Sequence, residues 1–158
     1  MKLAIGSDKS GFTVKEAIKA YLKEANIECD DLGTVDLNDV HPYYRVASDV
    51  APKVQDGTYE KAILICGTGA GMSVVANKFK GVHAVACESM YAAKMARAIN
   101  NANVLCMGGW IVGPEMAIEM VKIFLSTDWC QDLEDWRREN MKKFAVQVSA
   151  IEDKIYDR

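Results

Sequence analysis

This chain has very little histidine: His41 and His83 are the only two in 158 residues, which argues against most histidine-rich metal sites. Its five cysteines are an odd number without C-x-x-C spacing, so we expect reduced thiols and neither a disulfide framework nor a zinc site. No apolar run approaches the roughly 18 residues of a membrane span, and the strand-like run from Leu3 follows no signal peptide. A net charge of −3 argues against nucleic-acid and membrane-surface partners. We therefore expect a cytoplasmic protein.

What the chain does contain is a regular alternation of strand-like apolar runs and helix-like amphipathic runs. These runs follow one another at residues 3–6, 13–25, 27–32, 44–54, 62–66, 72–77, 82–87, 90–99, 104–107 and 115–124. Strands separated by helices form right-handed βαβ units, which predicts an α/β, Rossmann-like three-layer sandwich with a five-stranded parallel sheet. The run 62–66 is the most hydrophobic and is expected at the centre of the sheet. Half of the residues are hydrophobic, which fits one domain over residues 1–158.

The last segment, residues 126–158, differs from the rest of the chain. It carries Trp129, Trp136, Phe144 and Val148 among many charged residues and has no strand-like run. A helix with aromatic side chains on one side is stabilised mainly by packing against another surface. We expect a helical tail that packs on a partner subunit, or otherwise on the edge of the sheet.

The most informative segment is Cys66-Gly67-Thr68-Gly69-Ala70-Gly71, which directly follows the central apolar run. Glycines allow positive φ and a close approach of the backbone to a ligand. A helix that starts here would add unpaired N–H groups, which attract an anion, and would lower the pKa of a nearby thiol. Cys66 is thus predicted to be a nucleophile or base beside an oxyanion or phosphate cradle. The alternative is a small buried residue that closes a strand.

The same loop departs from two common nucleotide-binding motifs. The dinucleotide fingerprint G-x-G-x-x-G needs its third glycine one position later, although Glu88 falls near the end of the next strand, where an acidic residue is expected. A P-loop would need Gly-Lys-Ser/Thr, which is absent here. Because a cysteine has no role in the dinucleotide fingerprint, dinucleotide binding is the weaker interpretation.

Other candidate residues follow the ends of strands or lie in the tail. Asp8 and Lys9 follow the first strand, where Asp8 could orient sugar hydroxyls and Lys9 could contact a phosphate; a capping Asp and a solvated Lys are the alternative. Arg137 and Arg138 could bind a phosphate, reaching into a neighbouring subunit, or form a solvated helix face. In the run Asn100-Asn101-Ala102-Asn103, at least one asparagine is expected to face the site.

Several segments together resemble the ribose-5-phosphate isomerase B / galactose-6-phosphate isomerase family, in order through nearly the whole chain. They are Ile5-Gly6-Ser7-Asp8, Ile63-Leu64-Ile65-Cys66-Gly67-Thr68-Gly69, Ala76-Asn77-Lys78, Asn100-Asn101-Ala102-Asn103-Val104 and Ile111-Val112-Gly113. The resemblance implies a cytoplasmic dimer or tetramer that interconverts aldose and ketose phosphates, of the ribose 5-phosphate type or a related tetrose or hexose phosphate. It also implies that neither metal nor cofactor is needed.

The resemblance assigns the chemical roles at the glycine-rich loop. Cys66 is the base that moves a proton between C1 and C2, and Thr68 assists it. The backbone N–H groups of Gly67, Gly69 and Gly71 stabilise the enediolate.

The substrate contacts follow in the same way. Asp8 matches the family's ligand for substrate hydroxyls and Tyr43 its pocket tyrosine, while Asn100 is the candidate among the asparagines. Lys9, Arg137 and Arg138 are the candidates for the phosphate.

Three positions depart from the family pattern. Lys9 stands where ribose 5-phosphate members have histidine, Ile99 where a ring-opening histidine is usual, and Trp110 where an arginine contacts phosphate. A tetrose 4-phosphate cannot form a furanose, so Ile99 suits such a substrate. Alternatively, a paralogous subunit supplies the histidine, as in hetero-oligomeric galactose-6-phosphate isomerase. A non-catalytic sugar-phosphate-binding protein is a third possibility, against which the intact Cys-Gly-Thr-Gly argues.

Overall fold

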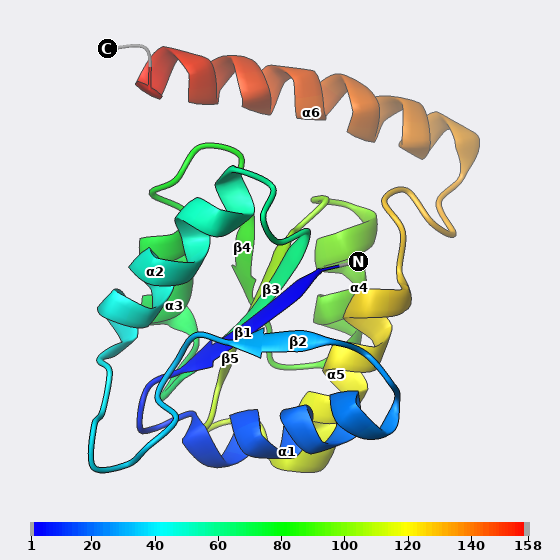
Figure 1. Cartoon of the computed structure of the whole chain (residues 1–158). Helices are drawn as coiled ribbons and strands as arrows, with labels where there is room; N and C mark the ends of the chain where they lie inside the picture. Colours follow the sequence, from blue (N-terminus) through cyan, green and yellow to red (C-terminus); the bar gives the residue numbers. More distant parts are fainter. Residues whose placement is uncertain (1, 157–158) are drawn as a thin grey trace.

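Five parallel strands form one sheet in the order β2-β1-β3-β5-β4 in the computed structural model, which describes residues 2–156 (Figure 1). The strands are β1 Leu3–Ser7, β2 Cys29–Asp31, β3 Lys61–Cys66, β4 Ala84–Ala86 and β5 Val104–Gly108. The most hydrophobic run becomes β3, the central strand, and its residues from Ala62 to Cys66 are buried. The predicted α/β fold with a five-stranded parallel sheet is therefore confirmed.

Six helices occur in the described residues, and five of them cover the two faces of the sheet. They are α1 Phe12–Glu24, α2 Tyr43–Gln55, α3 Ala70–Ala76, α4 Met90–Ala98, α5 Pro114–Ser126 and α6 Asp135–Tyr156. One apolar core joins the sheet to α1, α4 and α5, and a second joins its other face to α2 and α3. No helix within residues 2–156 combines the length and the apolar character that crossing a lipid bilayer requires.

Local sequence explains where several helices begin and end. Val14, Ile18 and Leu22 recur at helical spacing and form the buried stripe of α1. Ser89 caps α4, since its side chain accepts the N–H of Ala92. Pro114 opens α5, where its missing N–H is not needed.

Some predicted boundaries were wrong by a few residues. The helix after the glycine-rich loop begins at Ala70 rather than Met72, and the strand expected at 82–87 is only Ala84–Ala86. His83, which was expected to lie within that strand, therefore precedes it. The physical reason is that the amide oxygen of Asn103 accepts the N–H of His83, so a side chain replaces the strand partner there.

The register places the carboxyl ends of three central strands side by side. Ser7 of β1 is paired with Ile65 of β3, and Cys66 is paired with Gly108 of β5. At the opposite, amino-terminal edge of the sheet lies α6, drawn across the top of Figure 1, where Glu152 accepts the N–H of Gly81 in the segment before β4. Parallel strands of this length separate the two edges by roughly 15 Å.

Candidate active site

The Cys66 side chain ends the central strand and is almost fully buried, with 5% of its surface exposed. Its sulfur accepts a hydrogen bond from the N–H of Gly69 at 3.1 Å. Gly69 adopts φ +79°, and a Cβ there would lie 2.8 Å from the carbonyl carbon of Met107. Glycine is required at this position for both reasons, and the resulting sharp turn directs a backbone donor at the thiol.

Backbone hydrogen bonds join the loops after β1 and β5 to the cysteine loop. The N–H of Asp8 donates to the carbonyl oxygen of Ile65 at 3.2 Å. On the other side, Gly109 donates to Cys66 at 2.7 Å and Trp110 to Gly67 at 3.0 Å. Asp8 and Trp110 therefore flank the cysteine loop from two neighbouring strands.

The Asp8 carboxylate is held in place by its own loop. Its Oδ1 accepts the N–H groups of Ser10 at 2.8 Å and Gly11 at 3.1 Å. Burial raises the pKa of Asp8 above its usual value of 3.8, while the two N–H donors act in the opposite direction. The alternative that Asp8 caps the helix was wrong, because the N-cap of α1 is Gly11 and no side chain caps it; the Asp8 carboxylate closes the turn that precedes the helix. Lys9, the next residue, is exposed.

Two aromatic rings lie against the glycine-rich loop. A Cβ on Gly67 would meet the indole of Trp110 at 2.7 Å, and a Cβ on Gly71 would meet the ring of Tyr43 at 2.8 Å. Trp110 is 74% exposed and Tyr43 is 41% exposed, so each ring packs one part on the loop and presents the rest to solvent. Thr68 lies between the two glycines and is exposed.

The structure brings most of the predicted site residues to this carboxyl edge. They are Asp8, Lys9, Tyr43, Cys66, Gly67, Thr68, Gly69 and Gly71.

Three predicted residues, Asn100, Arg137 and Arg138, lie at the opposite edge. Asn100 lies between α4 and β5, in the wall of a cavity of about 420 Å³ that α6 also lines. The segment before α6 is attached to the end of α4 through the Cys130 N–H and the carbonyl oxygen of Ala98, 2.9 Å apart. Both arginines are exposed on the first turn of α6. A single chain therefore does not bring these three side chains to Cys66.

The other asparagines in the run have local partners. The Asn101 side chain accepts a hydrogen bond from Arg97 at 3.0 Å, and its φ of 50° ends the helix region with a left-handed residue. Asn103 bonds to the backbone of His83 and Gly81. Asn100 is thus the member of the run that remains a candidate for substrate contact.

Two features of the site region were not predicted from the sequence. One is the packing of Trp110 on Gly67. The other is Lys15, whose side chain is fully buried among charged partners. The signal for Lys15 was present, since it lies three and seven residues before Ile18 and Leu22 and so shares their apolar helix face. Within residues 2–156, no group of three His, Cys, Asp or Glu side chains could hold a metal ion.

Known proteins resemble this chain over most of its length. The 4-deoxy-4-sulfo-D-erythrose isomerase of Clostridium sp. (strain MSTE9) is 52% identical over 156 residues, which cover 99% of this chain and 98% of that protein. D-erythrulose-4-phosphate isomerase 2 of Mycolicibacterium smegmatis is 39% identical over 131 residues, 82% of this chain and 86% of the relative.

Solved structures and a family model agree with these relatives. Ribose-5-phosphate isomerase B of Clostridium thermocellum superposes with a TM-score of 0.87 at 34% identity, covering 98% of this chain and 99% of that one. A family model described as Ribose/Galactose Isomerase matches residues 3–141, which include both edges of the sheet described above. The chain therefore belongs to the ribose/galactose isomerase family.

Proposed function

We propose that this protein is an aldose–ketose isomerase for a four-carbon sugar that carries a terminal oxyanion, a sulfonate or a phosphate. The observation that carries the proposal is the Cys66 thiol, which accepts the Gly69 N–H where the strand ends meet, with the Asp8 backbone bonded to the neighbouring residue Ile65. This arrangement supplies a proton acceptor, backbone donors and a ligand for hydroxyls in one place. Residues 1–158 act as one isomerase domain with a helical tail.

Isomerisation through an enediolate requires one proton to move between C1 and C2. Cys66 removes that proton and returns it to the neighbouring carbon, with Thr68 assisting at the exposed side of the loop. The N–H groups of the loop glycines, Gly67, Gly69 and Gly71, stabilise the oxyanion that develops. Asp8 and Tyr43 hold the substrate hydroxyls.

The four-carbon substrate follows from Ile99 and from the relatives. Ile99 has no exchangeable side-chain proton, so it cannot open a sugar ring by acid–base catalysis. A four-carbon aldose with sulfonate or phosphate at C4 lacks the free C4 hydroxyl that would close a furanose. It therefore reaches the site in open-chain form. Two relatives are named for four-carbon substrates, one a sulfonate and one a phosphate.

The anionic end of the substrate is bound between two copies of the chain. Lys9 supplies one cation from the thiol edge, and Arg137 or Arg138 supplies the second from α6 of the other copy, which also contributes Asn100. The 22-residue helix α6 has no buried residue in the single chain. Several of its large apolar side chains are more than half exposed, among them Trp136, Phe144, Val148, Ile151 and Ile155. Such a surface is typical of an interface, which supports a homodimer or a tetramer built from dimers.

A substrate panel tests the proposal. We expect kcat/KM of the purified protein for 4-deoxy-4-sulfo-D-erythrose or D-erythrose 4-phosphate to exceed that for ribose 5-phosphate by about tenfold or more, because a missing site contact changes discrimination by that order. Faster turnover of ribose 5-phosphate would contradict the four-carbon assignment. Binding of these sugars without interconversion would indicate the non-catalytic binding protein. Activity on galactose 6-phosphate that appears only with a paralogous chain would indicate a hetero-oligomer.

A further inference from the structure

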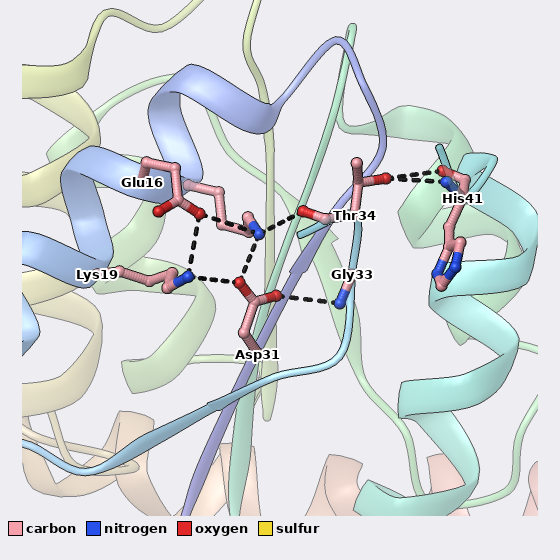
Figure 2. A network of polar contacts seen from close by, with 7 residues as sticks. Glu16, Lys19, Asp31, Gly33, Thr34 and His41 are labelled. Atoms are coloured by element: carbon pink, nitrogen blue, oxygen red, sulfur yellow. Dashed lines mark hydrogen bonds and ion pairs between the residues drawn. The ribbon is translucent and has the colours of Figure 1, made fainter. Parts of the chain in front are cut away.

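The fully buried ammonium group of Lys15 has three acceptors within the protein. Its Nζ donates to the backbone carbonyl oxygen of Thr34 at 2.6 Å. The same nitrogen pairs with the carboxylates of Asp31 and Glu16. Lys19 also bonds to both carboxylates, so the two positive charges face two negative ones (Figure 2). A buried lysine is tolerated here because its charge is paired with two carboxylates and its Nζ donates hydrogen bonds to Asp31 and Thr34.

Thr34, whose carbonyl oxygen accepts from Lys15, lies near the start of the loop between β2 and α2 and bonds to His41 near its end. It is fully buried, and its N–H donates to Ser7 at 2.8 Å. Its Oγ1 accepts the N–H of His41 at 3.0 Å, and the same hydroxyl reaches the carbonyl oxygen of His41, as Figure 2 shows. Residues 35–40 between them are exposed. Lys15 thus fixes the point at which both ends of an exposed loop meet.

This point lies two residues before the start of α2. His41 is followed by Pro42, and α2 starts at Tyr43, whose ring lies against Gly71. The path from Lys15 through Thr34 and His41 to Tyr43 consists of two hydrogen-bonded contacts and two peptide steps. The other end of the same anchor, Ser7, directly precedes Asp8.

We propose that Lys15 is a positioning residue of the isomerase: through Thr34 it holds the β2–α2 loop where Tyr43 lies on the glycine-rich loop. The inference rests on the proposed function, because Tyr43 contacts substrate only if that function is right. The ion pairs of Lys15 and Lys19 with Asp31 and Glu16 are similar, but Lys15 alone of the two bonds to Thr34. Lys19 therefore provides a matched control.

The test compares Lys15→Met, Thr34→Val and Lys19→Met, at a temperature at which circular dichroism shows each to be folded. Lys15→Met keeps the length of the side chain and removes the donor to Thr34, and Thr34→Val removes the hydroxyl that binds His41. We expect both to speed amide hydrogen exchange in residues 33–43 and to raise KM by about tenfold, with a smaller change in kcat. Lys19→Met is expected to leave exchange in this segment and KM within about twofold of wild type.

The outcomes separate the two proposals. If Lys15→Met lowers the unfolding temperature but leaves the exchange of residues 33–43 and KM unchanged, Lys15 is merely structural and the inference is wrong. If Lys15→Met does not fold, unchanged exchange and KM in Thr34→Val have the same meaning. If wild type converts none of the sugars, the proposed function fails, while the exchange rates still decide whether Lys15 holds the loop.

Discussion

The indole ring of Trp110 packs directly on the backbone of Gly67, the residue after the candidate base. A Cβ at Gly67 would come within 2.8 Å of three ring atoms, and the Trp110 backbone N–H donates to the Gly67 carbonyl oxygen at 3.0 Å. The loop after β5 therefore places the uncharged ring of Trp110 next to the loop that follows Cys66. This packing of the Trp110 ring requires glycine at position 67, because any Cβ there would overlap the ring.

We expect Gly67→Ala to reduce kcat/KM by about tenfold or more, because the methyl group must displace either the indole or the loop that carries the enediolate donors. Gly113→Ala is the control, since a Cβ at Gly113 meets only the flexible end of Glu115 at 3.9 Å. Steady-state kinetics of both variants give the answer. Equal activity in the two would show that the packing on Gly67 has no effect on the reaction.

Replacing Trp110 should change the preference between substrate anions. A phosphate monoester carries nearly two negative charges at pH 7 and a sulfonate carries one, and arginine binds phosphate bidentately. Trp110→Arg should raise the ratio of kcat/KM for erythrose 4-phosphate over the C4 sulfonate by about tenfold. Trp110→Phe, which keeps an uncharged ring, should leave the ratio near that of wild type. An unchanged ratio in Trp110→Arg would place the anion elsewhere.

Loss of the proposed base should affect chemistry and not binding. Cys66→Ala is expected to lower kcat by about 10²–10⁴, the usual contribution of a positioned base, with little change in the affinity for a sugar phosphate. Cys106→Ala is the comparison, because Cys106 is a fully buried thiol in the same core that the mechanism does not use. Calorimetric binding and initial rates distinguish the two effects. Full activity of Cys66→Ala would show that Cys66 is not the base.

Mixed dimers test whether the site is shared between two copies. Cys66→Ala lacks the base, and the double variant Arg137→Ala/Arg138→Ala lacks the tail cations, so each homodimer should be nearly inactive. Random mixing makes half of the dimers mixed, each with one intact site, so about a quarter of wild-type activity should return. The mixture is formed by co-expression and compared with the separate proteins. No recovery, or full activity of the double variant, would contradict a shared site.

The hydrogen bonds and ion pairs of Asp31 make the free energy of unfolding depend on pH in the acid range. Burial alone would raise its pKa, but hydrogen bonds from Lys15, Lys19 and the Gly33 N–H outweigh burial and hold the pKa below 3.8. The unfolded chain, with a carboxyl pKa of about 3.9, then binds the proton more readily than the folded one. This contribution to stability is complete well above that value and is lost as pH falls through the lower, folded pKa.

The prediction is tested by measuring the free energy of unfolding of wild type and Asp31→Asn between about pH 6 and pH 2. The difference between them should be constant above about pH 5 and should shrink below about pH 4. A difference that is the same at all these values would show that the Asp31 ion pairs do not stabilise the fold.

Much of this fold follows from short-range patterns. The apolar run at 62–66 predicts the central strand, and Pro114 predicts a helix start, because burial on two faces and a missing N–H are local properties of the sequence. The predicted start of β4 was wrong because the amide oxygen of Asn103, 20 residues away, accepts the His83 N–H that a neighbouring strand would otherwise bind.

The sequence by itself determined the alternation of strands and helices and the cysteine–glycine loop, since each depends on neighbouring residues. Only the tertiary structure decided that Asp8 and Trp110 flank that loop, because strand order and register bring β1, β3 and β5 together. It also decided that Asn100 lies at the other edge of the sheet and that Lys15 is buried against Thr34. These relationships join segments far apart in the chain, and the packing of whole elements, not local propensity, fixes them.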